Sequence, residues 1–514
     1  MATSCSLGGQ SDRGPAVAFV GGAATDEPRA ALAARDVLAA GGSAVDAATA
    51  AYFALAVTMP GTATLGGSGV CLVYDARLTR VEAIDFAAPA AAGGSPVPMN
   101  ARGFFVMQGR YGRQRWEQLV APAEGLARFG APVSRALARE LAENAGTIAA
   151  NPDLARVFRR NGAPLREGDT LVQSDLADTL GQLRSRGAKE FYEGSSAADF
   201  VAAARAAGAR FGVEEFRGAT PQFRAPIAVN VDGLRMSFAA PPANAGLYQA
   251  QLWQMLLPRW RGAARDEQPH LFAEATRRAQ LETARWPSLD LSNFGTVGEL
   301  SSAQRAAQLM ADYRPGQRNG AAGDGGFTED PATATIVVAD KEGGAVACAV
   351  TAGGAFGAGR IARGVVLARA SEPSGRGLPS LNAMIGVRAY GGGFSLSPRA
   401  ESSQLVFVGA GSGRGAASTL VQAALTTVID RRPLDEAFDR PRFGYFAGSD
   451  ELQGEAEVGQ RFASLAARGH RLAAPSAFGR INAIACAEGL IDEPTSCRVR
   501  ADTRGHGLAV GGVR

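Results

Sequence analysis

Residues 330–351, DPATATIVVADKEGGAVACAVT, restrict the fold of this 514-residue chain more than any other stretch. Residues 333–339 are all small or β-branched, which is typical of a strand, with Thr333, Thr335, Val337 and Ala339 on one face and Ala334, Ile336 and Val338 on the other. The loop at 341–343 then ends in Gly343, at the position of a three-residue hairpin loop that needs a positive φ. With residues 345–351 as the returning strand, this register places Thr333 directly opposite Thr351.

The facing threonines have two interpretations. Directly opposed Cβ atoms in an antiparallel pair lie about 4.5–5.5 Å apart, so the hydroxyls of Thr333 and Thr351 can form a hydrogen bond. Such pairs also occur simply as part of a sheet, and the pattern alone does not separate that interpretation from a nucleophile and its partner. Residues 316–329, GQRNGAAGDGGFTE, are polar and glycine-rich and predict an irregular loop just before the hairpin.

The charge pattern excludes several classes of partner. Lys and Arg total 53 and Asp and Glu total 49, which gives a net charge of +4 without any block of like charges. This dispersed, nearly balanced charge argues against a nucleic-acid or membrane-surface partner. No run of about 18 apolar residues occurs, so no membrane span is predicted.

The cysteines and histidines give no support for a metal site. The cysteines stand at positions 5, 71, 348, 486 and 497, without a C-x-x-C pair. Cys486 and Cys497 could close a disulfide or remain buried free thiols. His270, His470 and His506 lack metal-ligand spacing, and the first two are interpreted as structural. The sequence therefore predicts no metal and no cofactor, and it favours a mechanism that needs no histidine.

The first residues, MATSCSLGGQ, lack the charged and apolar regions of a complete signal peptide. Cys5, followed by Ser and Gly, is similar to the start of a mature lipoprotein. A short unstructured tail over residues 1–18 is the alternative.

Other segments predict the type of fold. Residues 28–42 read as a helix ended by Gly41 and Gly42, and Ser43 with Asp46 forms a capping box for a second, almost wholly apolar helix. Strands follow at 69–76 and 80–86, helices fill 115–215, and a hairpin lies within 226–246. Because strands and helices come in runs, we expect an α+β sandwich whose sheets are covered by helices, without internal repeats.

Residues 404–422, QLVFVGAGSGRGAASTLVQ, predict a strand, a glycine-rich loop and a helix. This order is also found in dinucleotide-binding sites. That interpretation fails, since Arg414 occupies the third glycine position and no second strand with a ribose-binding acid follows.

Together, these segments resemble the γ-glutamyltranspeptidase family. Residues 330–359 resemble its cleavage-site pattern, T-T-H-x-S-V-V-D-x-x-G-N-A-V followed by a threonine and F-G. Further similar stretches follow in the family's order, among them LGGSGVCLVYDA, PLREGDTLVQSDLADTL, PPANAG, HLFAEATRRA, VGAGSGRGAASTLVQ and ADTRGHGLAVG. Many weak matches in one order are more specific than any single match.

The resemblance implies the four-layer αββα sandwich of N-terminal-nucleophile hydrolases and a precursor that cuts itself. The cut would fall between Ala332 and Thr333. It would leave residues 19–332 as the large-subunit portion and 333–514 as the small-subunit portion, within one compact unit.

The resemblance also implies the chemistry. Thr333 would be the nucleophile, with its freed α-amine as base, and Thr351 would hydrogen-bond it. Backbone N–H groups of Ser412 and Gly413 would stabilise the oxyanion. Gly353 and Ser380 match substrate-binding positions. The reaction would be amide hydrolysis or acyl transfer on glutathione, another γ-glutamyl compound or an altered amide, in the periplasm or outside the cell; a cytoplasmic location stays open.

Departures from the family concentrate at the glutamate-binding positions. Ala87 replaces the arginine of D-F-R, which would bind a carboxylate in a bidentate manner. Gly353 replaces an asparagine, Ser380 stands alone where the family has two serines, and residues 368–375, ARASEPSG, replace the lid. Thr335 takes the place of a histidine and has no role in the pattern.

These departures favour an altered substrate. Four arginines in nearby motifs could bind an anion or be solvated surface residues: Arg360, Arg363, Arg369 and Arg414. The alternative functions are a catalytically inactive family member that serves as a binding or structural protein, and an unrelated α+β protein.

Overall fold

The computed structural model describes residues 19–87, 94–319, 329–330, 332–369, 381–389 and 403–513. The predicted tail with Cys5, residues 320–328 of the glycine-rich loop, the substituted lid from residue 370 onward, and Ser380 lie outside these described residues.

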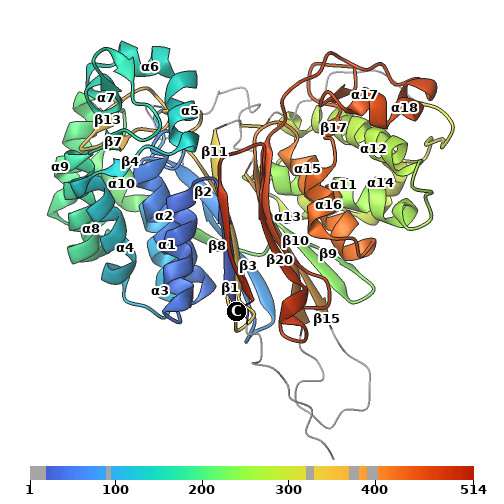
Figure 1. Cartoon of the computed structure of the whole chain (residues 1–514), viewed down its shortest axis with the longest axis horizontal. Coiled ribbons are helices and arrows are strands. Elements are labelled where there is room, and N and C mark those ends of the chain that lie inside the picture. The colour runs from blue at the N-terminus through green and yellow to red at the C-terminus, as the bar shows by residue number, and fades with distance from the viewer. Residues whose placement is uncertain are drawn as a thin grey trace, which may run out of the picture.

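Two antiparallel sheets lie face to face, and helices cover both outer faces (Figure 1). The seven-stranded sheet has the spatial order β21 (Leu508–Val513), β1 (Phe19–Thr25), β11 (Thr333–Ala339), β12 (Ala345–Thr351), β2 (Ser68–Asp75), β3 (Arg80–Phe86), β8 (Gln222–Arg224). The six-stranded sheet has the order β20 (Cys497–Ala501), β19 (Arg480–Cys486), β16 (Ser403–Ser412), β15 (Asn382–Ala389), β10 (Leu234–Phe238), β9 (Ile227–Val231).

The first helical layer covers the seven-stranded sheet (Figure 1). It contains α1 (Pro28–Ala39), α2 (Ala44–Thr58), α3 (Asn100–Tyr111), α4 (Trp116–Phe129), α5 (Arg135–Glu143), α6 (Ala145–Ala150), α7 (Pro152–Phe158), α8 (Ser174–Glu193), α9 (Ser195–Ala206) and α10 (Val213–Gly218). Two-residue strands lie between some of these helices along the chain: β4 (Ala131–Pro132), β5 (Arg159–Arg160), β6 (Ala163–Pro164) and β7 (Thr170–Leu171). A later pair, β13 (Ile361–Ala362) and β14 (Val365–Val366), lies against α9.

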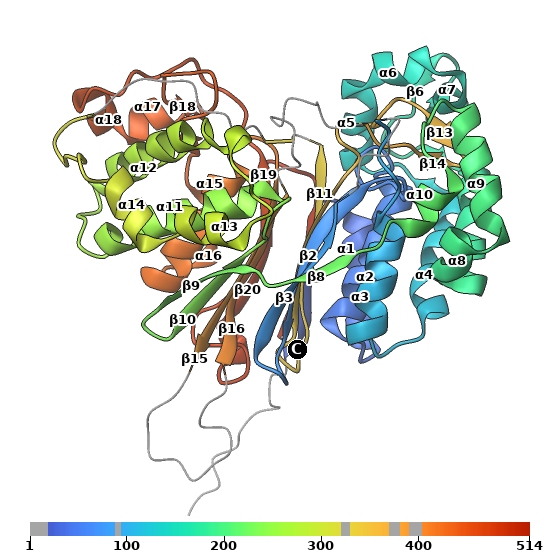
Figure 2. The ribbon, with the colours of Figure 1, turned by 180° about the vertical axis from the view of Figure 1, so that it is seen from behind.

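The second helical layer covers the six-stranded sheet, and Figure 2 shows it from behind. It contains α11 (Asn244–Trp260), α12 (Gln268–Thr283), α13 (Phe294–Leu300), α14 (Ala303–Leu309), α15 (Ala416–Ala424), α16 (Leu434–Asp439), α17 (Val458–Arg461) and α18 (Ala463–Ala467). A π-helical turn, Leu425–Ile429, continues α15, and β17 (Phe443–Gly444) pairs with β18 (Gln453–Gly454).

The central hairpin β11–β12 has the predicted register. Thr333 pairs with Thr351 and Ala339 with Ala345, and Gly343 has a φ of +93°. Every residue of both strands is buried. Since side chains alternate along a strand, Ile336 packs in the core under the first helices and Val337 in the core between the sheets.

The helical hairpin α1–α2 also forms as predicted. Gly41 has a φ of +82°, and the Ser43–Asp46 capping box is present at the start of α2. Asp340, in the hairpin loop, accepts hydrogen bonds from the backbone N–H groups of Ala44 at 2.8 Å and of Gly344 at 2.9 Å. One carboxyl group thus connects the start of α2 to the hairpin.

Two disulfides cross-link neighbouring strands. Cys486–Cys497 joins β19 to β20 and resolves the alternative that the sequence left open. Cys71–Cys348 joins β2 to β12 and was not predicted, because 277 positions separate the two cysteines. Among the described residues, no helix combines the length and the apolar character needed to cross a membrane.

Candidate active site at the end of the central hairpin

Several strands place polar residues at one end of the sandwich. Asp26 follows the end of β1, Thr333 begins β11 and Thr351 ends β12. In the other sheet, Ser412 ends β16 opposite Arg480, which begins β19. Because neighbouring strands are antiparallel, the end of one lies beside the start of the next, so these residues from distant parts of the chain come together.

Thr333 and Thr351 are both buried. The Thr351 hydroxyl lies 2.6 Å from Asp330 Oδ2 and 3.1 Å from the carbonyl oxygen of Ala332, so it can donate its proton to either. It also accepts the backbone N–H of Gly353 at 2.9 Å. The Thr333 hydroxyl donates to the Asp330 carbonyl oxygen at 3.4 Å. Thr351 therefore contacts the carbonyl group that directly precedes Thr333.

The glycine-rich loop between β16 and α15 faces the same segment. Gly413, with a φ of +83°, donates its backbone N–H to the Asp330 carbonyl oxygen at 3.3 Å. The Ser412 hydroxyl is buried and has no hydrogen-bond partner in the described part of the chain. Gly479 allows close packing here, since a Cβ at this position would lie 2.1 Å from the Ser412 carbonyl oxygen.

Glu329 binds to the start of α15. Its carboxylate accepts the backbone N–H of Ala417 at 2.7 Å and that of Gly415. A helix N-terminus favours negative charge, but burial raises the pKa of Glu329 to about 7 against these hydrogen bonds. Residues 329–330 therefore lie against the glycine-rich loop in the uncut chain.

A buried cluster beneath the threonines gives Thr335 a role. Asp26 Oδ2 accepts from the backbone N–H of Thr335 at 2.9 Å and from its hydroxyl at 3.1 Å. Asn482 donates to Asp26 Oδ1 at 3.0 Å and to the Thr335 hydroxyl at 2.7 Å. Arg480 forms an ion pair with Asp26 at 3.0 Å and reaches the Thr333 carbonyl oxygen at 3.4 Å. The cluster ties β1, β11 and β19 together below the site.

Sequence reasoning missed Asp26, Asp330, Arg480 and Asn482. Asp26, Arg480 and Asn482 belong to no local motif, and they contact the hairpin from other strands or their ends. The one available signal was position: Asp330 lies three residues before Thr333.

A cavity of about 280 Å³ borders the site. Its walls include Ala332, Ser412, Gly413 and Arg480, together with side chains of α5. A small molecule in this cavity would therefore lie beside both the glycine-rich loop and the residue that precedes Thr333.

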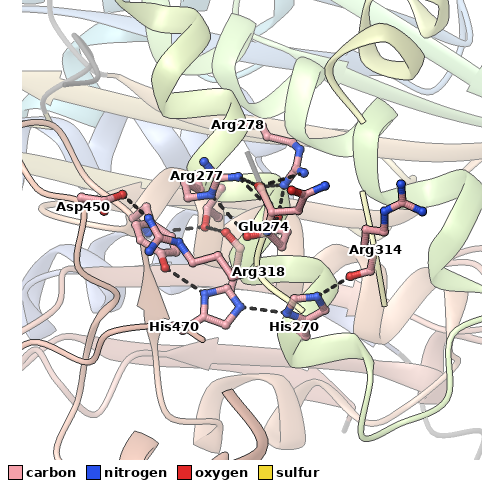
Figure 3. Close-up of polar contacts among 12 residues, drawn as sticks. His270, Glu274, Arg277, Arg278, Arg314, Arg318, Asp450 and His470 are labelled. Atoms are coloured by element: carbon pink, nitrogen blue, oxygen red, sulfur yellow. Dashed lines mark hydrogen bonds and ion pairs between the residues drawn. The ribbon is translucent and has the colours of Figure 1, made fainter. Parts of the chain in front are cut away.

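Two histidines lie in a buried polar network beside the segment that leads to residue 319 (Figure 3). His270 Nδ1 and His470 Nε2 are 2.8 Å apart, and the other nitrogen of His270 is 2.8 Å from the Arg314 carbonyl oxygen. The Tyr445 hydroxyl is 2.8 Å from His470 Nδ1. Burial, and then the neighbouring His270, lower the pKa of His470 to about 4. These contacts fit the structural role that the sequence predicted.

The same network holds the end of that segment. Glu274 forms ion pairs with Arg277, at 3.2 Å, and with Arg278 (Figure 3). Arg277 also donates to the Asn319 carbonyl oxygen, and Arg318 pairs with Asp450. The chain is therefore fixed up to Asn319, shortly before the predicted cleavage site.

Of the remaining predicted positions, Gly353 contacts Thr351, whereas Ala87 does not line the cavity. Gly353 has a φ of +71°, and a Cβ there would come within 2.6 Å of the Arg369 carbonyl oxygen, so the backbone requires glycine. Ala87 donates its backbone N–H to Asp85, which is paired with Arg224 at 2.9 Å.

Of the four arginines, three donate hydrogen bonds elsewhere. Arg360 donates to the Gly208 carbonyl oxygen, Arg369 to that of Gly357 and Arg414 to Gln453. Arg414 alone among the four lines the cavity.

Comparison with known proteins gives a consistent relationship. Residues 30–374 match the family model described as gamma-glutamyltranspeptidase. The chain is similar to the glutathione hydrolase proenzyme of Escherichia coli (strain K12), at 27% identity over 502 residues that cover 87% of this chain and 85% of that protein. It is also similar to the acylase ACY 1 proenzyme of Pseudomonas sp. (strain V22), at 26% identity with 92% and 91% covered.

Solved structures support the fold. A cephalosporin acylase from Bacillus halodurans superposes with a TM-score of 0.75, covers 99% of both chains and is 20% identical, which shows the fold alone. The γ-glutamyltranspeptidase of Helicobacter pylori has a TM-score of 0.52 and 26% identity and covers 57% of this chain and 91% of that chain. The predicted αββα sandwich is confirmed.

Proposed function

Since the chain belongs to the γ-glutamyltranspeptidase family, we propose that it is a self-processing amide hydrolase or acyltransferase whose nucleophile is Thr333. The family match confirms the predicted relationship, and relatives named as glutathione hydrolase and acylase proenzymes agree with the predicted enzyme class. The nucleophile, the cleavage site and the substrate are proposals.

One observation carries the proposed cut between Ala332 and Thr333. The Thr351 hydroxyl lies 3.1 Å from the carbonyl oxygen of Ala332, in the bond that would break. When the Thr333 hydroxyl attacks that carbonyl carbon, negative charge develops on the oxygen, and a hydroxyl donor stabilises it. The C–N bond between Ala332 and Thr333 then breaks as an ester forms on the threonine oxygen, and water hydrolyses this ester. The products are a large portion that contains residues 19–332 and a small portion, residues 333–514.

In the processed enzyme, Thr333 supplies both nucleophile and base. Its new α-amine takes the proton of its own hydroxyl, which attacks the substrate amide and forms an acyl-enzyme. Backbone N–H groups of Ser412 and Gly413 stabilise the oxyanion, and Gly353 holds Thr351 through its backbone N–H. Water or an amine then accepts the acyl group. Ser380 completes the proposed substrate-binding set.

The proposed substrate is glutathione, another γ-glutamyl compound or an altered amide. Ala87 stands where the family has the arginine that would bind a glutamyl carboxylate. An acylase proenzyme is among the relatives. Both points support an amide other than a strict γ-glutamyl donor.

The two disulfides favour an oxidising compartment. We therefore propose a periplasmic or extracellular location, with Cys5 as a proposed lipid-attachment site. Metabolic labelling with a fatty acid, compared between the wild type and Cys5→Ala, tests the attachment.

The test of processing is a denaturing gel of the purified protein under reducing conditions. We expect two bands for the wild type and one for Thr333→Ala. A single band for the wild type after long incubation would instead support the alternative, a catalytically inactive family member. Hydrolysis of γ-glutamyl-p-nitroanilide then tests the substrate, and activity like that of strict γ-glutamyl enzymes would refute an altered specificity.

A further inference from the structure

Four arginines line a second cavity, of about 230 Å³, beside the six-stranded sheet. Arg388 lies in β15, Arg431 and Arg432 in the turn after the π-helical segment, and Arg498 in β20. These side chains define the arginine pocket. No Asp or Glu is among the described residues that line it, whereas the active-site cavity is lined by carboxylates as well as arginines. The fold therefore gathers in one place positive charges that are dispersed in the sequence.

The guanidinium groups of the arginine pocket have few anionic partners. Arg432 pairs with the carboxylate of Glu436. Arg388 and Arg498 donate to backbone carbonyl oxygens, at 2.9–3.1 Å. Arg431 is exposed and forms no hydrogen bond or ion pair with another described residue. Since a guanidinium carries five N–H donors, each of the four keeps donors for a ligand.

The turn after the π-helical segment holds two of these arginines at the pocket. The segment ends at Ile429, and Arg431 has a φ of +53°. Helices commonly end in glycine at such a left-handed position, because the conformation strains residues that have a Cβ. The backbone N–H of Arg432 donates to the Thr426 carbonyl oxygen at 3.0 Å and closes the turn. The backbone thus favours glycine at position 431, so its conformation does not account for the arginine.

The arginine pocket lies at the end of the sandwich opposite the proposed nucleophile. β15 begins beside the glycine-rich loop, where Asn382 pairs with Gly411, and Arg388 lies near its other end. Figure 1 shows that other end at the bottom, where the C-terminal end also lies. Because Phe19 pairs with Val513, β1 begins at the bottom as well. The pocket is therefore separate from the proposed amide chemistry and shares an end of the molecule with the start of the first described strand.

We propose that the arginine pocket binds a phosphate ester. Phosphate oxygens accept the parallel N–H groups of arginine in a bidentate manner, and a concave wall of one sign of charge concentrates ions of the other sign. The hydroxyl of Ser496, which also lines the pocket, is a further donor. A water molecule takes about 30 Å³ of the liquid, so the pocket has room for a phosphate group. A soluble phosphate ester is one source of this group, and a phospholipid headgroup, next to the lipid proposed at Cys5, is the other.

Binding of sn-glycerol 3-phosphate tests the pocket with a soluble probe. We expect phosphorus NMR to detect binding to the Cys5→Ala protein, which cannot carry the proposed lipid. Adding Arg431→Gln and Arg498→Gln should weaken binding about tenfold or more, the usual effect of losing charged hydrogen bonds. The control pair, Arg186→Gln with Arg205→Gln, removes two charges from exposed positions on α8 and α9 and should leave binding unchanged. An unchanged melting temperature without ligand shows that each variant folds.

Sedimentation with vesicles separates the two sources of phosphate. The same proteins are mixed with vesicles of phosphatidylcholine, with and without phosphatidylglycerol. Binding to phosphatidylglycerol vesicles that requires Arg431 and Arg498 identifies a lipid headgroup as the ligand. Binding of sn-glycerol 3-phosphate without such vesicle binding identifies a soluble ester. Binding of neither probe, binding that survives the loss of both arginines, or an equal loss in the control pair refutes the phosphate site.

Discussion

Asp330 is the residue that most directly couples the two threonines. Its carboxylate accepts from the Thr351 hydroxyl at 2.6 Å and from the backbone N–H of Ala332 at 2.8 Å, and its carbonyl oxygen accepts from the Thr333 hydroxyl and the Gly413 N–H. One residue of the uncut chain therefore orients the proposed nucleophile, its partner and the oxyanion loop.

We expect Asp330→Asn to slow self-cleavage about tenfold or more, because an amide loses the charge-assisted hydrogen bond to Thr351. The rate is measured from the loss of uncut chain on reducing gels. Asp153→Asn, on the exposed surface of α7, is the matched control. An unchanged rate in Asp330→Asn would remove this residue from the proposed mechanism.

Asp26 should be important for stability. Asp26→Asn would leave Arg480, whose side chain is 26% exposed, without its ion-pair partner and would weaken the hydrogen bonds from Thr335 and Asn482. Losing a hydrogen bond to a charged group costs about 2 kcal/mol, less than breaking a fully buried pair, so we expect a loss of that order in the free energy of unfolding from urea denaturation. Asp36→Asn, which breaks an exposed pair with Arg35, should change it by less than about 1 kcal/mol.

Residues of the site were predictable where one local pattern fixed them. The two-residue period of a strand and the glycine in the loop are enough to predict the Thr333–Thr351 pairing. Asp26 and Asn482 were not predictable, because their roles depend on contacts with residues far away in the sequence. Thr335 had no assignable function until Asn482 of the opposite sheet was placed beside it.

At the scale of helices and strands, the ends of an element were predictable where the sequence contains a helix cap or a turn. Gly41, Ser43 and Asp46 fixed the end of α1 and the start of α2. The two-residue strands were missed, since so short a segment has no periodicity to detect. The π-helical turn after α15 was missed too, because its sequence, LTTVI, reads as a continuing helix.

The network between α12 and His470 should make stability depend on pH. Burial lowers the pKa of His470 to about 4 in the folded chain, against about 6.5 when unfolded. The unfolded chain therefore binds more protons between these values. The stabilising contribution of His470 to the free energy of unfolding is complete above about pH 6.5 and is lost as the pH falls toward 4.

Replacing His470 by glutamine should reduce this acid sensitivity, because an amide hydrogen-bonds without titrating. Melting temperatures of Thr333→Ala and of Thr333→Ala with His470→Gln, measured from pH 8 to 4, provide the test. Parallel profiles would show that other groups cause any acid destabilisation.

At the scale of the whole molecule, the proposed cut divides both sheets. The seven-stranded sheet takes β1, β2, β3 and β8 from the first portion and β11, β12 and β21 from the second. In it, β1 lies between β21 and β11, and in the other sheet β10 pairs with β15. The two portions therefore share both sheets and the core between them.

We expect the cut chains to stay together without denaturant. Size-exclusion chromatography of the processed protein in a reducing buffer should give one peak that contains both chains, because separating them would expose whole strands and buried cores. Two separate peaks would contradict this arrangement.

The layers of the fold were predictable from the runs of strands and helices, and the four-layer order came from the resemblance. The spatial order of the strands was not predictable from their residues. The pairs β1–β11 and β10–β15 join segments far apart along the chain, and neither strand carries a local signal for its partner.

The disulfide between Cys71 and Cys348 makes part of the chain a covalent ring. The proposed cut, between residues 332 and 333, lies inside that ring. Hydrolysis there opens the ring and releases no fragment, so the intact, non-reduced mass would rise by only one water molecule. The cut protein therefore stays one covalent molecule, and its two polypeptides separate only after the disulfide is reduced.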